Sequence, residues 1–198
     1  VDAFIENGPK AIEFFTKKTC VQFNMPVTFP DYHAEAVGGQ PGGRSMLTRP
    51  FDGRELGERV KYLGMPLPEL TVFGMMLGSG PEIRHFMRVF KSFESFVFVA
   101  KRLSRHFLDV LRYGRGMSLI NGNALAGRLA KAAMDLNIPV WLSSPVKSLV
   151  TEYDGVSGAL VEHEGNTVKV TAKYGVVLAC GGFPHDVERR KQLFPHAP

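Results

Sequence analysis

Two adjacent glycines at the end of an apolar run are the residues of this sequence best placed for ligand chemistry. Residues 176–179 (Val-Val-Leu-Ala) are typical of a strand covered on both faces in a parallel sheet. Gly181 and Gly182 follow at its carboxyl end, where open α/β sheets bind ligands and a missing Cβ lets a ligand reach the backbone. This pattern alone leaves a plain structural turn open as the alternative.

No pattern in the sequence predicts a metal site. The six histidines are scattered singly, and the two cysteines, Cys20 and Cys180, form neither a CxxC pair nor a metal-spaced cluster. Two unpaired cysteines fit a reducing compartment, so we expect a cytoplasmic protein.

Composition and charge describe a globular chain with an uneven distribution of basic residues. The 198 residues are 44% hydrophobic, enough for one core, and the longest apolar stretches are too short for a membrane helix. We therefore expect no integral membrane segment. The net charge of +5 is concentrated between Arg84 and Arg115. A solvated helix face is one interpretation, and attraction to an acidic surface or phospholipid is the other.

The first two thirds of the chain predict helices on either side of a long loop. We expect a helix over residues 2–19, a strand over 21–23, a Pro- and Gly-rich loop over 25–50 and a short helix over 51–64. Apolar residues recur at steps of three and four over 86–111, which predicts a helix or helix pair whose apolar stripe packs into a core. A further helix over 125–136 ends before Pro139.

The last third changes to the pattern of strands. Runs rich in β-forming residues at 146–153, 156–162 and 167–172 are separated by the pairs Asp154-Gly155 and Gly165-Asn166, both suited to tight turns. This predicts a three-stranded meander, followed by the apolar strand at 176–179.

The order of these elements resembles the FAD-dependent fumarate reductase and 3-oxosteroid dehydrogenase family. The resemblance covers Gly-Asn-Ala-Leu-Ala-Gly-Arg-Leu at 122–129, Ser-Pro-Val-Lys at 144–147, the meander and the strand that ends in two glycines. It implies that Val146 lies beside the adenine of FAD through its backbone, and that Ala179, Cys180, Gly181 and Gly182 lie near the dinucleotide. Cys180 departs from the family, which more often has Thr or Ala there.

The first half is similar to one branch of that family, the 3-oxosteroid 1-dehydrogenases. Phe-Pro-Asp-Tyr-His at 29–33 and Arg-Pro-Phe-Asp-Gly-Arg-Glu-Leu-Gly at 49–57 carry this resemblance. The tyrosine of the Pro-Asp-Tyr segment belongs to the active site of that branch, so the resemblance assigns Tyr32 a catalytic role as a proton donor or relay. The alternative is that Asp31 and Tyr32 make a turn and bury the ring.

The resemblance implies an α/β fold: part of a Rossmann-like FAD-binding domain with a β-meander and an inserted helical segment. We divide this partial domain, 1–198, into residues 1–64 (helix, strand and loop), 65–116 (helical insertion) and 117–198 (helix, meander and glycine strand). The strand–GxGxxG–helix unit that holds the pyrophosphate is not found, since Gly78-Ser79-Gly80 lacks a preceding strand and Gly114-Arg115-Gly116 follows a helix. We therefore expect an internal fragment that lacks this unit and the substrate-capping domain and is inactive by itself.

The function implied by the resemblance is dehydrogenation of a 3-oxosteroid-like substrate across C1–C2, with hydride transfer to flavin N5. A fumarate reductase or succinate dehydrogenase type flavoprotein, acting on a dicarboxylate, is one alternative. A basic amphipathic module that makes weak peripheral contact with a membrane is the other. No nucleic-acid partner is expected. The phenylalanine-rich segment 86–107 would either wall an apolar substrate or, as its stripe favours, pack in the core.

Overall fold

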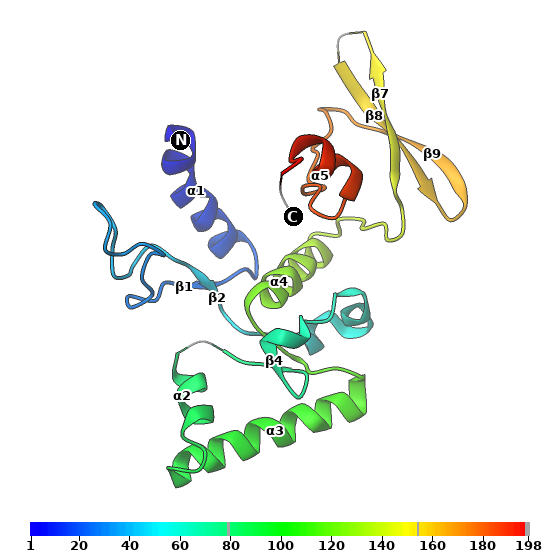
Figure 1. Cartoon of the computed structure of the whole chain (residues 1–198). Helices are drawn as coiled ribbons and strands as arrows, with labels where there is room; N and C mark the ends of the chain where they lie inside the picture. The colour runs from blue at the N-terminus through cyan, green and yellow to red at the C-terminus, as the bar shows by residue number, and fades with distance from the viewer. Residues whose placement is uncertain (79, 154, 197–198) are drawn as a thin grey trace. The chain divides into compact units, whose positions relative to one another are not determined.

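The computed structural model describes residues 1–78, 80–153 and 155–196, which form two compact units (Figure 1). The first unit is Val1–Pro139 and the second is Val140–Pro198. The division of the chain at residues 64 and 116 stays a prediction. Ser79 of the Gly78-Ser79-Gly80 segment and Asp154 of the predicted turn lie outside the described residues.

The first unit is built from helices and very short strand pairs. In chain order its elements are α1 (Asp2–Lys18), β1 (Phe23–Asn24), β2 (Leu47–Thr48), β3 (Phe51–Asp52), the 3-10 helices η1 (Gly53–Tyr62) and η2 (Pro68–Leu70), β4 (Thr71–Val72), β5 (Met75–Met76), α2 (Pro81–Met87), α3 (Phe93–Tyr113), β6 (Ser118–Leu119) and α4 (Asn121–Asp135). The strands pair as β1–β2, β3–β6 and β4–β5, all antiparallel. The helix predicted over 51–64 is instead a two-residue strand and a 3-10 helix, interrupted where Gly57 takes a φ of 55°.

The core of this unit lies where α4 covers the β3–β6 pair. Phe51 and Leu119 are paired across these strands and are almost fully buried, with Leu56, Val60, Met117 and Ala124 around them. Gly127 brings α4 against this pair, because a Cβ there would lie 2.9 Å from the Phe51 ring. Arg128, the next residue, stacks over the same ring at 5.2 Å and donates to the carbonyls of Cys20 and Pro50. One helix thus joins strands that are far apart in the sequence.

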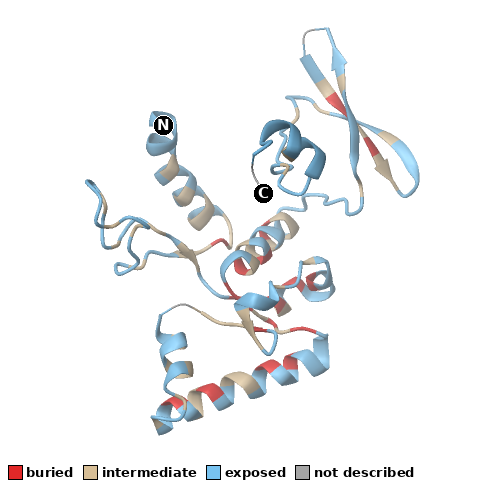
Figure 2. Ribbon diagram, viewed as in Figure 1, coloured by how far each residue is buried: buried red, intermediate tan, exposed pale blue. Residues whose placement is uncertain are grey.

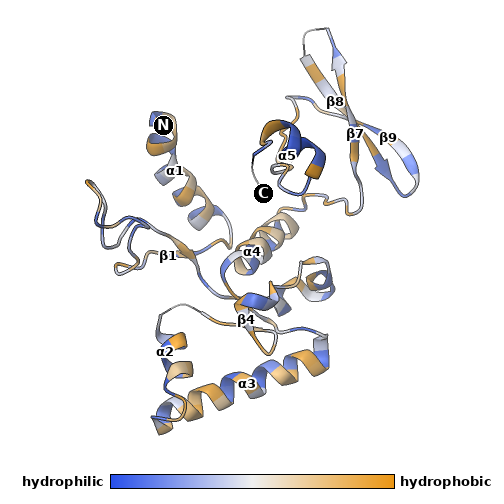
Figure 3. Cartoon of the chain, in the orientation of Figure 1, coloured by the Kyte–Doolittle hydropathy of each residue, from blue (hydrophilic) through white to orange (hydrophobic). Residues whose placement is uncertain are grey.

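Helix α3 confirms the helix predicted within residues 86–111, whereas α2 ends at Met87 and lies almost wholly before that range. The prediction that the apolar stripe packs into a core is wrong. Among the described residues, Phe90, Phe93 and Leu111 are 95%, 82% and 85% exposed. The buried members of α3 are Ser95, Val99, His106 and Asp109. Figures 2 and 3 show α3 as a largely apolar helix with much of its length exposed. The reason is that α3 packs through hydrogen-bonded and ion-paired groups on its polar side.

The second unit contains the predicted meander. Strands β7 (Val146–Glu152), β8 (Gly155–His163) and β9 (Asn166–Thr171) are antiparallel in the order β7–β8–β9, so β8 is central. The β8–β9 connection is Glu164-Gly165, one residue earlier than predicted; both have positive φ, 50° and 78°, as a type I′ turn requires. Helix α5 (Val187–Leu193) follows, with Asp186 accepting from the Arg189 amide at its start.

The apolar strand predicted at 176–179 is not a strand in the structure. Residues 176–183 belong to no strand or helix, and Val177 and Leu178 are 89% and 68% exposed. A strand exists only through hydrogen bonds to a neighbour, and each strand described in this unit pairs within the meander. All strand pairs among the described residues are antiparallel, so the parallel, Rossmann-like sheet is not seen in this part of the chain.

Candidate functional site

Tyr32 lies on a long loop whose base and interior are both fixed. The loop runs over residues 25–46 and is closed by the antiparallel pairing of β1 with β2. Inside it, the Asp31 carboxylate accepts from the Gln40 amide at 3.0 Å and from Arg44 Nη1 at 3.2 Å. Arg44 also donates to the Gly38 carbonyl at 2.8 Å. A side chain at position 31 therefore braces the turn that carries Tyr32.

The Tyr32 ring is fully exposed among the described residues, at 104% of its reference area. The alternative in which this segment makes a turn and buries the ring is therefore half right: Asp31 makes the turn, and the ring stays outside. Close packing of the loop requires glycine at position 42, where a Cβ would lie 1.8 Å from the Val27 carbonyl oxygen. The loop therefore holds an exposed phenol on a backbone that is fixed by hydrogen bonds and close packing, which suits a residue that contacts a ligand.

The five residues predicted to bind a cofactor all belong to the second unit. Val146 begins β7, an edge strand, and is 58% exposed; it pairs with Val161, and the register shifts between Val146 and Ser148. An edge strand leaves backbone N–H and C=O groups on one side free for a ligand.

Residues 179–182 are all exposed. Gly181 has a φ of 74°, and a Cβ there would meet no heavy atom within 4 Å. Glycine at this position is therefore favoured by backbone conformation and not by packing within the unit. The neighbouring Cys180 is a free, exposed cysteine.

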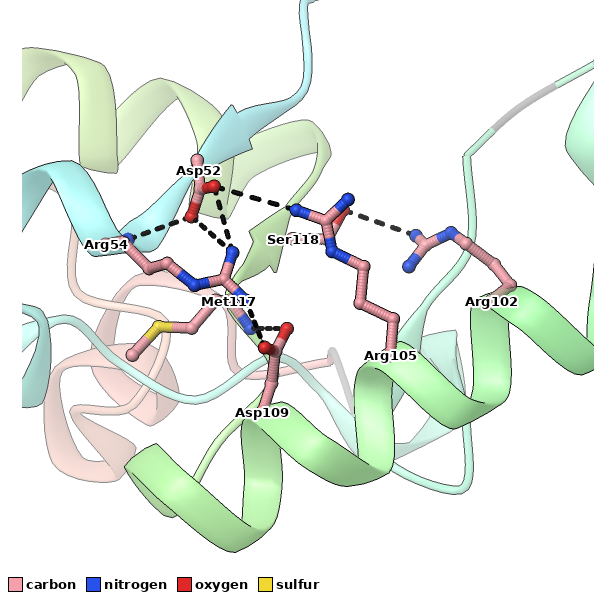
Figure 4. A network of polar contacts seen from close by, with 7 residues as sticks. All are labelled: Asp52, Arg54, Arg102, Arg105, Asp109, Met117 and Ser118. Carbon is pink, nitrogen blue, oxygen red and sulfur yellow. Dashed lines mark hydrogen bonds and ion pairs between the residues drawn. The ribbon is translucent and has the colours of Figure 1, made fainter.

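A polar network that the sequence analysis missed holds α3 against η1 and β6 (Figure 4). The Asp52 carboxylate accepts from the Arg54 amide at 3.0 Å and from its guanidinium at 2.9 Å. Arg54 also pairs with Asp109, whose side chain is 6% exposed and accepts from the Met117 amide at 3.3 Å. Partial burial lowers the pKa of Arg54. The hydrogen bond to Asp52, with the charges of Asp52 and Asp109, outweighs this effect, so the pKa is raised overall.

The signal that could have revealed this network is a second stripe on α3. Ser95, Arg102, His106 and Asp109 recur at steps of seven, four and three, which places them on one helical side. His106 Nε2 lies 3.0 Å from the Phe73 carbonyl oxygen and therefore carries a proton that it donates. The polar stripe, and not the apolar one, identifies the packed face.

Two of the basic residues counted in the sequence are structural. Arg115 is 6% exposed and donates to the carbonyls of Val60, Leu63 and Gly64 at 3.0, 2.6 and 3.1 Å, and burial lowers its pKa. Arg102 donates to Glu82 at 2.7 Å and to Ser118 at 3.3 Å. Neither guanidinium is free to attract a distant anion.

A hollow of about 500 Å³ lies beside Arg102 in the first unit. Its wall includes the apolar side chains of Leu47 on β2, Phe98 on α3, and Pro50 and Ile120 from the connections next to these strands and helices. His85 also lines it, stacked on Phe98 at 4.5 Å with Nδ1 3.1 Å from Ser95 Oγ. Mostly apolar walls with a few polar groups are typical of small-molecule sites of this size. No group of three or more His, Cys, Asp or Glu side chains that could hold a metal is found in the described part of the chain.

Comparisons with known proteins give one consistent result. A family model described as "FAD binding domain" matches residues 1–198. The 4-oxocyclohex-2-ene-1-carboxylate 5-dehydrogenase of Sinomonas cyclohexanicum is 41% identical over 99% of this chain and 33% of its own length. A 3-oxosteroid 1-dehydrogenase of Mycobacterium tuberculosis is 30% identical over 96% of this chain and 34% of its own length.

A solved structure agrees with these relatives. The crystal structure of 3-ketosteroid delta1-dehydrogenase from Sterolibacterium denitrificans, in complex with 1,4-androstadiene-3,17-dione, superposes with a TM-score of 0.80 at 31% identity. It is matched over 96% of this chain and 35% of that chain, so the chain spans about a third of the length of these relatives. The resemblance stated from the sequence is confirmed, as are its mixed α/β fold and its flavin cofactor. Because the family model covers every residue, the chain belongs to the FAD binding domain family.

Proposed function

We propose that this chain is part of an FAD-dependent oxidoreductase that dehydrogenates a ring ketone across a CH–CH bond near the carbonyl, with a 3-oxosteroid-like substrate. The observation that carries the proposal is similarity over 96–99% of the chain to proteins named as dehydrogenases of two different ring ketones. The two names share a ketone on a ring and differ in the size of the rest of the molecule.

Tyr32 is the residue of this chain that we assign to the chemistry. Its exposed phenol on a braced loop can donate a proton to, or relay one from, a substrate bound against the loop. When bound, FAD would supply the redox chemistry as the hydride acceptor, through N5. The main catalytic base is not assigned to any residue of this chain.

The residues that would hold FAD are Val146, through its backbone, and Ala179, Cys180, Gly181 and Gly182. Two observations support this assignment: Val146 begins an edge strand, and residues 179–182 are exposed, with open space where a Gly181 Cβ would stand. We assign these groups to one side of the dinucleotide. A pyrophosphate site would have to come from a glycine-rich helix start outside the motifs found here.

The hollow beside Phe98 is the feature that supports an apolar ring substrate. Of the phenylalanines in segment 86–107, Phe98 lines the hollow and the others do not. The segment therefore contributes one wall through Phe98. The base of the Tyr32 loop reaches the same hollow, because Asn24 of β1 and Leu47 of β2 line it. A ring bound there would lie beside the strands that carry the loop.

The test is anaerobic mixing of the purified full-length protein with a 3-oxosteroid, a 4-oxocyclohexenecarboxylate and succinate in separate experiments. We expect a ring ketone to bleach the flavin absorbance and succinate to leave it unchanged. Bleaching by succinate alone would support the fumarate reductase or succinate dehydrogenase alternative and overturn the proposal, as would no bleaching by any of the three.

The role of Tyr32 is tested in the same assay. Tyr32→Phe should slow flavin reduction by about 10²–10⁴-fold, the usual contribution of a general acid or base, with the flavin content unchanged. Tyr62→Phe is the matched control, because Tyr62 is also exposed, at 59%, and lies on η1. Equal rates for Tyr32→Phe and the control would remove Tyr32 from the mechanism.

A further inference from the structure

Helix α3 turns its polar side toward the rest of the first unit and its apolar side outward. Its buried residues are Ser95, Val99, His106 and Asp109. On the other side Phe93, Val97, Ala100, Phe107 and Leu111 follow one another at steps of four, three, seven and four. Phe93, Phe107 and Leu111 are 82%, 53% and 85% exposed. We call these five residues the outer stripe.

Basic side chains follow one edge of the outer stripe. Lys101, Arg105 and Arg112 are exposed and lie four and seven residues apart, hence on the same side of the helix. Arg105 approaches Asp52 at 3.8 Å, whereas Lys101 and Arg112 have no ion pair with a described residue. Arg84, Arg88 and Lys91, on α2 and the turn before α3, are exposed as well.

Few acidic groups balance these cations. Between residues 81 and 115, the Glu82 carboxylate pairs with Arg102 and the Asp109 carboxylate pairs with Arg54. Glu94 is the remaining acidic residue of the segment and is exposed. The α2–α3 surface is therefore positively charged next to an apolar stripe.

We propose that this surface binds an anionic phospholipid bilayer, with α3 lying in the plane of the interface. Phe93, Phe107 and Leu111 enter the boundary between headgroups and acyl chains, as the apolar side of an interfacial helix does. Lys101 and Arg112 lie against lipid phosphates while their aliphatic stems extend along the apolar surface. In the described part of the chain no helix is long and apolar enough to cross a bilayer, so the contact is peripheral.

The charge pattern selects a bilayer over two other occupants. A second copy of the same face would bring Lys101 and Arg112 toward identical cations, which repel. An apolar protein segment would cover the outer stripe but give the basic edge no counter-charge. Anionic lipid satisfies both features at once, and it does so independently of the proposed enzymatic activity.

The experiment is co-sedimentation of the full-length protein with vesicles of phosphatidylcholine alone or mixed with phosphatidylserine. We expect binding to the mixed vesicles at low salt, and its loss at about 0.5 M NaCl, where charges are screened within a few Å. Each cation contributes roughly fivefold to partitioning at an anionic surface, so Lys101→Glu/Arg112→Glu should weaken binding by at least about 25-fold. Phe107→Ser/Leu111→Ser should also abolish most of the binding at low salt.

Matched controls come from α1, which is also exposed and carries both residue types. Phe4→Ser/Ile5→Ser and Lys10→Glu/Lys18→Glu remove apolar and basic groups that are also exposed, and both variants should bind vesicles like the wild type. Flavin content and thermal unfolding confirm that each variant is folded. The proposal is overturned if the wild type binds neither vesicle, if it binds neutral vesicles equally at all salt concentrations, or if the α1 controls lose as much binding as the α3 variants.

Discussion

The ion pair between Asp109 and Arg54 should be the polar contact that most stabilises the position of α3. Asp109→Asn keeps the size of the side chain and an oxygen that can accept from the Met117 amide, but it removes the charge opposite Arg54. A hydrogen bond to a charged group contributes about 1.5–3 kcal/mol. The loss of stability should stay below the 3–5 kcal/mol expected when a buried charge loses its partner, because Arg54 still pairs with Asp52 and its side chain is a third exposed. We expect a loss of about 2 kcal/mol in the local stability of α3.

Hydrogen exchange measured by mass spectrometry reports this loss for α3 itself, without requiring the full-length protein to unfold in one step. A loss of about 2 kcal/mol corresponds to roughly 30-fold faster exchange of amides in α3. Asp135→Asn is the control, because its pair with Lys131 is a local i,i+4 pair within α4 whose carboxylate is half exposed, and such a pair should contribute less than about 1 kcal/mol. Unchanged exchange in α3, or an equal effect of the control on its own helix, would refute the assignment of Asp109 as a packing residue.

Three further outcomes follow from individual contacts. Gly42→Ala places a Cβ 1.8 Å from the Val27 carbonyl oxygen and should displace the loop that carries Tyr32, so flavin reduction by substrate should slow while flavin content is kept. Leu119→Ala empties a fully buried core position and should cost about 2–5 kcal/mol, measured as faster exchange in β6 and α4. The pKa of Glu152 is lowered, mainly by the hydrogen bond from Lys169. The stabilisation by this pair is therefore present above the ordinary carboxyl pKa and is lost as the pH falls through the lowered pKa. Lys169→Met should raise the pKa of Glu152 in an NMR titration.

Elements with a strong local signal were predictable from the sequence. The meander follows from alternating strands with tight-turn residues, and α4 follows from its apolar spacing and the proline after it. Of the two-residue strands only β1 was anticipated, by the strand predicted over residues 21–23. The others were not predictable: β3, for example, exists only through pairing with β6, more than sixty residues later, and no local pattern encodes that contact.

The same reasoning explains the two main errors. The apolar run at 176–179 has the composition of a buried strand, but composition does not supply the neighbour that a strand needs. The stripe on α3 has the spacing of a core face, yet Asp109 and His106 on the other side form the specific contacts. Periodicity identifies which residues share a face, and only the partner of each face decides which one is buried.

In the candidate site, Tyr32 and Gly181 were both predicted from the sequence, and the structure gives a different reason for the exposure of each. Tyr32 is exposed because Asp31 and Arg44 occupy the inside of its loop, which leaves the phenol outward. Gly181 is exposed with open space around it, as a backbone that a ligand approaches would be. Both lie in a chain that spans a third of the length of its relatives, so exposed apolar groups need a second criterion before a ligand is assigned to them. Charge supplies that criterion: the outer stripe of α3 has a basic edge, which favours anionic lipid, whereas the run at 176–179 carries no charge and gives no such indication.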